Sequence, residues 1–220
     1  MKKFLFLVLF ALTVSFASAQ DVVKFLGIPV DGPKSEMIKK LQEKGFKYDS
    51  ENDLLHGMFN GEDLSLRVYA NRDGKVWQIT LLDTKVRDKD DIKTRFNMLL
   101  WQFLGTNKYV KIMGDIIPDS EDIEKGILID GKKYQVQYQA HFLPSGIDVS
   151  DFEFEKLKDL TEEKIQELTV EEQLLIMEKV LRLAKLSCVW FQIGDSSGGG
   201  YIICMYYTNP NNDPRNGEDL

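Results

Sequence analysis

The segment from Phe25 to Phe46, FLGIPVDGPKSEMIKKLQEKGF, constrains the fold more than any other part of the chain. An extended apolar stretch is stopped by Asp-Gly-Pro at 31–33, and a short helix follows in which Met37 and Leu41 share one face. Proline suits the start of a helix because its missing N–H would have no partner there. Gly45 suits the left-handed position that ends one. The pattern predicts an extended lead-in followed by a short amphipathic helix.

Antiparallel strands are predicted directly after this helix. Asn60-Gly61 and Asp73-Gly74 are two-residue hairpin signals, because both central positions of such turns favour positive φ. Between them, residues 64–70 alternate apolar and polar side chains, which is typical of a strand with one buried face. The next strand, residues 76–82, alternates in the same way, with Trp77 expected on the buried side. We therefore expect an antiparallel meander.

The remainder of the chain predicts further helices and hairpins. Residues 88–104 have helical apolar spacing and begin with aspartates, so they form the clearest helix in the sequence. The other expected elements are a strand at 109–113, a hairpin of 127–129 with 134–142, and a hairpin of 188–193 with 201–208. Residues 161–168 and 170–186 are expected to form two helices or one bent helix. Residues 209–220, rich in Asn, Pro and Asp, are expected to form a flexible tail.

These elements indicate an α+β fold, with antiparallel meander sheets and helices packed on one face. A unit of one helix followed by antiparallel strands recurs, beginning near residues 34, 88 and 161. We expect a single domain over residues 20–208, with a division into sub-modules at 20–84 and 85–208 as the alternative.

Residues 1–19 have the pattern of a cleaved secretory signal peptide. Lys2 and Lys3 precede an apolar run, and Ala17-Ser18-Ala19 is a small-residue cleavage site. The run is too short for an ordinary membrane span, and no other stretch suggests a transmembrane anchor. The mature chain would begin at Gln20, and we expect the protein to be exported, to the periplasm or out of the cell.

The charge of the chain argues against nucleic acid as a partner. The formal net charge is −7. Loss of Lys2 and Lys3 with the signal peptide would leave 26 basic residues against 35 acidic ones, a charge of −9. Phosphate backbones are bound through clustered Lys and Arg, so a chain of this composition repels them.

Cys188 and Cys204 leave two alternatives open. Export permits a disulfide, and a turn centred on Ser196 would place the two residues opposite each other on neighbouring strands. A shifted turn would not, because a disulfide needs Cα atoms within about 7 Å. The other interpretation is two buried free thiols.

The sequence contains no catalytic or cofactor-binding motif. Its only histidines are His56 and His141, which provide no dense His, Cys and carboxylate cluster at metal-ligand spacing. A nucleophile elbow, a phosphate-binding loop and a dinucleotide-binding glycine pattern are all absent. We therefore expect a protein that is not an enzyme and needs no metal or cofactor.

The predicted binding surface is an open sheet face. If strand 134–142 shares a sheet with 64–70 and 76–82, one face carries amides, an aromatic ring and an arginine, and Tyr and Arg are enriched at binding hot spots. The candidate residues are Arg67, Tyr69, Gln78, Thr80, Gln135, Gln137, Gln139 and His141. We expect a protein or glycan partner in the cell envelope, and the alternative is an ordinary solvated sheet face.

Two other functions fit the sequence. A hydrolase of glycans or peptides would gather carboxylates from distant segments, and the candidates near strand or loop ends are Asp83, Asp115, Asp148 and Asp151. A structural envelope protein would instead self-associate through strand edges or through the tyrosine-rich segment 201–208.

The opening segment 25–46 and the meander after it resemble uncharacterised secreted proteins of Bacteroides and Prevotella type. More distantly, residues 24–83 resemble the β-lactamase-inhibitor-protein-like fold, which small outer-membrane assembly lipoproteins share. The chain departs from those groups, because it lacks both the lipidated cysteine of the lipoproteins and the paired cysteines of the inhibitor repeats. The resemblance implies a helix-on-sheet module that holds another protein through its sheet face or loops.

Overall fold

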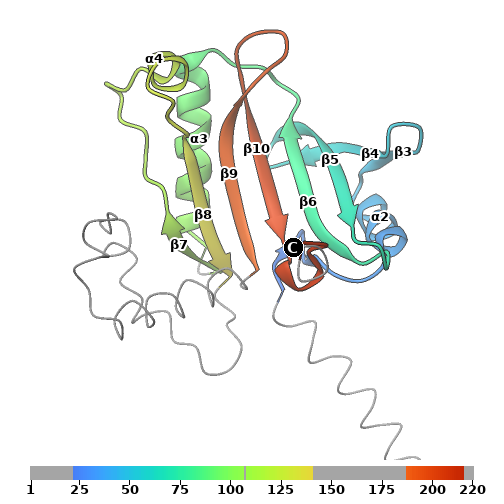
Figure 1. Cartoon of the computed structure of the whole chain (residues 1–220). Coiled ribbons are helices and arrows are strands. Elements are labelled where there is room, and N and C mark those ends of the chain that lie inside the picture. Colours follow the sequence, from blue (N-terminus) through green and yellow to red (C-terminus); the bar gives the residue numbers. More distant parts are fainter. Residues whose placement is uncertain (1–21, 107, 141–186, 216–220) are drawn as a thin grey trace, which may run out of the picture.

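The computed structural model describes residues 22–106, 108–140 and 187–215. Their main feature is one eight-stranded sheet, with strand order β3-β4-β5-β6-β10-β9-β8-β7 (Figure 1). Every pair of neighbouring strands is antiparallel. The predicted α+β class with antiparallel sheets and packed helices is therefore confirmed.

The sheet is built from two halves, each a helix followed by four strands. In the first half, helix α2 (Lys34–Glu43) precedes β3 (Lys47–Asp49), β4 (Leu54–Phe59), β5 (Glu62–Ala70) and β6 (Val76–Asp83). In the second, helix α3 (Lys89–Leu104) precedes β7 (Tyr109–Met113), β8 (Gln135–Ala140), β9 (Cys188–Asp195) and β10 (Tyr201–Thr208). The last strands of the two halves, β6 and β10, pair and join them. The helix-and-strand units expected near residues 34 and 88 are both present, and the one expected near 161 begins outside the described residues.

Local signals account for much of this arrangement. Between β4 and β5, Asn60 and Gly61 adopt φ of 52° and 76°, the paired positive values that a two-residue hairpin turn requires. At the start of α3, the Asp88 carboxylate accepts hydrogen bonds from the backbone N–H groups of Asp90 and Asp91. It thereby satisfies donors that the first turn of a helix leaves unpaired.

The segment before α2 differs from the predicted extended lead-in. It folds into a small hairpin of β1 (Lys24–Phe25) and β2 (Ile28–Pro29). The chain reverses there because Leu26 and Gly27 adopt φ of 51° and 81°. Phe25 consequently lies in the core, where its ring centroid is 5.1 Å from that of Tyr207 on β10.

The predicted strand at 127–129 is wrong. Residues Ile123–Leu128 form helix α4, and the side chain of Asp122 accepts a hydrogen bond from the backbone N–H of Lys125 at 3.2 Å. This capping contact favours a helix over an extended chain. Residues 134–142, the predicted partner of 127–129 in a hairpin, contain strand β8, and β8 pairs with β7 and β9. The predicted helices at 161–168 and 170–186 lie outside the described residues.

One face of the sheet forms the hydrophobic core. Directly opposed residues of antiparallel strands point to the same side of a sheet. One opposed row crosses β5, β6, β10, β9 and β8, and all its members are buried: Val68, Ile79, Tyr207, Val189 and Tyr138. Helix α2 contacts β5, and α3 contacts β9 and β10, with Phe96 against Phe191 at a centroid separation of 5.1 Å. Both helices thus cover the same face.

A buried ion cluster holds α3 against the end of β6. Asp83 Oδ2 accepts hydrogen bonds from Arg87 Nη1 at 2.9 Å and from Arg95 Nε at 3.2 Å. Arg87 also meets Glu62 Oε1 at 2.7 Å. Because the side chains of Arg87 and Arg95 are only 4% and 7% exposed, their charges depend on these carboxylates for compensation.

The start of the predicted flexible tail makes fixed contacts. Residues Pro210–Asn212 form a short 3-10 helix, η2, and the Asn209 side chain donates a hydrogen bond to the carbonyl oxygen of Val30 at 2.9 Å. These contacts direct the chain back across the start of β6. The guanidinium of Arg215 consequently lies 5.6 Å from the ring centroid of Trp77.

Candidate functional site

The face of the sheet opposite α2 and α3 carries three rows of opposed residues, and we call it the open face. The first row is Tyr69, Gln78, Thr208, Cys188 and Gln139. The second is Arg67, Thr80, Tyr206, Trp190 and Gln137. The third is Ser65, Leu82, Cys204, Gln192 and Gln135. Each row runs through β5, β6, β10, β9 and β8 in that order.

These rows contain every predicted site residue that the structure describes. Arg67, Thr80 and Gln137 share one row, Tyr69, Gln78 and Gln139 share another, and Gln135 lies in the third. His141 lies outside the described residues. The sheet thus brings the candidate side chains of β5, β6 and β8 onto one surface, and their role in binding stays a prediction.

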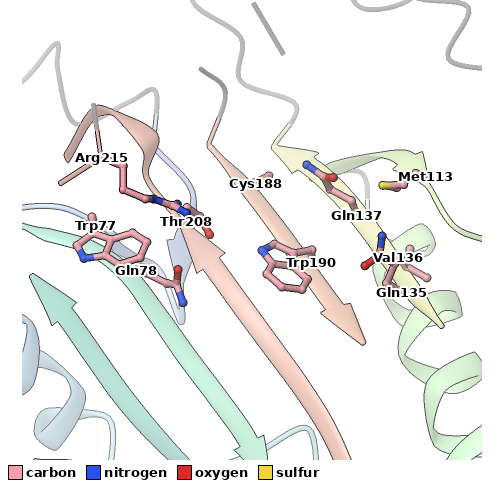
Figure 2. Close-up of a pocket in the computed structure, with 10 residues that line it drawn as sticks. All are labelled: Trp77, Gln78, Met113, Gln135, Val136, Gln137, Cys188, Trp190, Thr208 and Arg215. Atoms are coloured by element: carbon pink, nitrogen blue, oxygen red, sulfur yellow. The ribbon is translucent and has the colours of Figure 1, made fainter. Parts of the chain in front are cut away.

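A hollow of about 390 Å³ opens on this face (Figure 2). Two indole rings line it, Trp77 from β6 and Trp190 from β9, and three of the predicted amides lie beside them: Gln78, Gln135 and Gln137. The other lining residues are Met113, Val136, Cys188, Thr208 and Arg215. Arg67, Tyr69, Thr80 and Gln139 are not part of the lining. We call this feature the open-face hollow.

Trp77 reaches the hollow through an irregularity in the pairing of β5 and β6. Tyr69 is opposite Gln78 and Ala70 is opposite Val76, so Trp77 has no direct partner on β5. A β-bulge of this kind re-aims a side chain and breaks the alternation of faces. The expectation that Trp77 lies on the buried side with its apolar neighbours is therefore wrong.

Neighbouring side chains hold both indole rings in place. Trp190 stacks on Tyr206 of β10, with ring centroids 3.9 Å apart and an interplanar angle of 12°. Trp77 packs against Tyr69 of β5 at a centroid separation of 6.1 Å, and the guanidinium of Arg215 lies near its ring. Rings fixed in this way lose little freedom when a ligand packs on them.

The polar atoms around the hollow are only partly hydrogen-bonded. Gln78 Nε2 donates to Thr80 Oγ1 at 2.8 Å. Thr208 Oγ1 is buried and has no hydrogen-bond partner in the part of the chain that the structure describes. Gln139, next to the hollow on β8, is 3% exposed and its Oε1 lacks a partner within the same described ranges. Buried polar atoms of this kind are usually satisfied by a ligand or by ordered water.

The hollow carries little net charge. Its one ionised side chain among the described residues is Arg215, which donates to both carboxylate oxygens of Asp213 at 2.9 and 2.6 Å. The hydrogen bond from Arg215 holds the pKa of Asp213 below its usual value, so the pair stays ionised near neutral pH. Burial raises the pKa of the Cys188 thiol to about 11, against a smaller opposing effect of the Gln137 hydrogen bond.

Cys188 and Cys204 are free thiols, so the disulfide alternative is wrong. Tyr201 is opposite Asp195, which centres the hairpin on Gly198 instead of Ser196. Cys188 is consequently opposite Thr208, and Cys204 is opposite Gln192. Four positions of displacement correspond to about 13 Å along a strand, well beyond the span of a disulfide.

Asp83 and Asp115, the two hydrolase candidates that the structure describes, do not line this hollow. Asp83 belongs to the buried ion cluster, and Asp115 pairs with Lys111 at 2.7 Å. Asp148 and Asp151 lie outside the described residues. Within the described ranges, His, Cys, Asp and Glu form no group of three or more that could hold a metal ion. The helices described there are also too short or too polar to cross a membrane.

The tyrosine-rich strand suggested for self-association is an inner strand of the sheet that the structure describes. β10 is paired with β6 on one side and with β9 on the other along most of its length. The edges of the eight-stranded sheet are β3 and β7. Residues 201–208 therefore cannot pair with a strand of a second molecule while the sheet is intact.

Comparisons with protein-family models, with curated proteins and with solved structures found no match for this chain. The resemblances to secreted Bacteroides-type proteins and to the β-lactamase-inhibitor-protein-like fold accordingly stay predictions.

Proposed function

We propose that this protein is an exported, non-catalytic binding protein that holds a protein or glycan partner on its open face. The observation that carries the proposal is the open-face hollow, where two indole rings, three amides and a guanidinium group meet on one surface. Trp and Arg are enriched among residues that dominate binding energy, and concave sites with few polar groups are typical of ligand pockets.

The surrounding fold supports a role in presenting this surface. α2 and α3 cover one face of the sheet and bury its apolar side chains, so the side chains of the open face are carried by a rigid backbone. Sites built on strands hold their geometry better than sites on loops. The residues that line the hollow come from both halves of the chain, from β6 of the first half and from β8, β9 and β10 of the second.

Export is supported by the basic, apolar and small-residue pattern of residues 1–19. The acidic charge of the chain is consistent with a partner other than nucleic acid. The resemblance to inhibitor-type modules, which implies a sheet face or loops that hold another protein, points to the same kind of surface.

The proposal is tested by capture with matched variants. The exported chain is immobilised and exposed to envelope and culture extracts of its source organism, and retained proteins and glycans are identified by mass spectrometry. Trp190→Ala is expected to reduce retention of a specific partner by about tenfold or more, because truncating a central aromatic anchor commonly has such an effect. Trp77→Ala is expected to act in the same direction.

The control is Trp101→Ala, which removes an indole that is 60% exposed on α3 and lies outside the hollow. Retention by this variant should equal that of the unaltered protein, and the melting temperatures of all three variants show whether each is folded. Equal retention by folded Trp190→Ala, Trp77→Ala and unaltered protein would contradict the proposal, as would the absence of any retained partner.

A further inference from the structure

The hydrogen-bonding groups of the open-face hollow are suited to hydroxyl groups. Gln78, Gln135 and Gln137 each carry an acceptor oxygen and an NH₂ group with two N–H donors. One N–H of Gln78 is used on Thr80 and Gln137 is hydrogen-bonded to Cys188, which leaves further capacity on both amides. Thr208 adds a hydroxyl whose oxygen has no partner among the described residues. Side chains that both donate and accept hydrogen bonds are fully satisfied only by a ligand whose groups both accept and donate hydrogen bonds. A hydroxyl group has this property, whereas carbonyl groups only accept.

The indole rings offer flat apolar surfaces in addition. Trp77 lies on the β6 side of the hollow and Trp190 on the β9 side, with Thr208 of β10 between the two strands and Cys188 beside Trp190 on β9 (Figure 2). One face of Trp190 is covered by Tyr206, so that ring stays fixed beside the hollow. The face of an aromatic ring is electron-rich and favours contact with weakly polarised C–H groups.

The charges around the hollow favour a ligand without formal charge. No Asp or Glu is present among the described lining residues, so a cationic ligand would find no carboxylate there. The guanidinium of Arg215 is already paired with Asp213, so an anionic ligand would compete with that carboxylate. The net charge of −7 on the whole chain opposes anions further.

We infer that the open-face hollow binds a neutral oligosaccharide, an inference that rests on the proposed binding function. A pyranose ring combines an apolar C–H face with hydroxyl groups at its rim. Its face packs on Trp190 or Trp77, and neighbouring hydroxyls bond to Gln78, Gln135 and Gln137. The Arg215 guanidinium has five N–H donors and uses two of them on Asp213, so donors remain for a further hydroxyl.

The test is calorimetric titration of the full exported chain with defined probes. The neutral probes are hexasaccharides of α-linked and β-linked glucose, of mannose and of xylose. A galacturonic acid hexasaccharide serves as the charged probe, and a proline decapeptide tests an uncharged ligand that carries carbonyl acceptors only. We expect binding of at least one neutral hexasaccharide and none of the charged one.

Variants then locate the binding site. Trp190→Ala and Trp77→Ala are each expected to weaken the affinity by about tenfold or more, because each removes one stacking surface. Gln137→Leu, which keeps the approximate size of the side chain and removes the amide, is expected to weaken it several-fold. Trp101→Ala on α3 should leave the affinity unchanged.

The dependence on pH and salt gives a second readout. Of the titratable groups at the hollow, Asp213 stays ionised, Arg215 stays charged and the Cys188 thiol stays neutral between about pH 5 and pH 9. The affinity should therefore change by less than about twofold over that range and on addition of salt.

Three results would overturn the inference. The first is the absence of binding to every neutral hexasaccharide, and the second is binding that both folded tryptophan variants retain in full. The third is binding of the proline decapeptide alone. If the capture experiment still yields a partner that Trp190→Ala loses, the binding function stands and only the assignment to carbohydrate falls.

Discussion

Replacing Asp83 by alanine is expected to lower the free energy of unfolding by about 3–5 kcal/mol. The Asp83 carboxylate compensates the charges of Arg87 and Arg95, whose side chains are 4% and 7% exposed. Without it, two cations remain buried beside one partly exposed carboxylate, that of Glu62. Because the bond to Arg95 joins β6 to α3, the loss also loosens the helix that covers half of the core face.

Chemical unfolding followed by circular dichroism measures this effect. Asp115→Ala is the matched control, because the ion pair of Asp115 with Lys111 is at the surface and such pairs contribute about 0–1 kcal/mol. Asp83→Asn, which keeps an acceptor oxygen and removes the charge, should fall between the two. A free energy for Asp83→Ala within about 1 kcal/mol of the unaltered protein would contradict the proposed role of the cluster.

Replacing Phe191 by alanine is expected to cost about 3–5 kcal/mol of stability. Phe191 is fully buried on the core face of β9, and its ring meets those of Phe96 and Phe103 from α3 and Tyr138 from β8. Removal of the ring leaves a cavity between the sheet and the helix, which closely packed neighbours cannot fill without strain.

The adjacent residue provides the control for this prediction. Gln192 follows Phe191 on the same strand and therefore points to the open face. Gln192→Ala should change the free energy of unfolding by less than about 1 kcal/mol, as surface substitutions commonly do. Comparable losses for the two variants would show that the assignment of faces on β9 is wrong.

Elements with strong local signals could be predicted from the sequence alone. Helix α3 is specified by its apolar spacing and by the Asp88 cap, and the hairpin of β4 and β5 is specified by Asn60-Gly61. In each case the residues that determine the structure lie within a few positions of one another. The antiparallel sheet and its open face on β5 and β6 followed from the same short-range information.

The wrong predictions concern residues whose position depends on how distant segments pair. Alternation predicts Trp77 on the buried side, whereas the bulge in the pairing of β5 with β6 leaves Trp77 without a direct partner and places it on the open face. Cys188 and Cys204 could not be assigned because their positions depend on the centre of a glycine-rich hairpin. A small shift of register separates opposed residues by several ångströms, and a glycine-rich turn specifies the register only weakly.

The sequence predicts the residues of β6 and β8 that flank the candidate site, but not those of β9 and β10 between them. Gln78 and Gln135 were identified from their own strands, but the insertion of β10 and β9 between β6 and β8 cannot be read locally. Trp190 is therefore absent from the predicted site residues, although its alternation with Val189 and Phe191 is a signal for the open face. Arg215 lies in a segment expected to be a flexible tail, and the hydrogen bond from Asn209 is what brings it near the site.

The central claim, that the open-face hollow binds a neutral oligosaccharide, is tested most directly by fluorine NMR of the chain beginning at Gln20, labelled with fluorotryptophan. The chain contains three tryptophans, of which Trp77 and Trp190 line the hollow and Trp101 lies on α3. Each resonance is assigned from a Trp→Phe variant, and the neutral hexasaccharides are then added in turn. We predict that at least one of them shifts the resonances of Trp77 and Trp190 and leaves that of Trp101 in place. A panel that moves neither hollow resonance, or that moves Trp101 instead, would contradict the account.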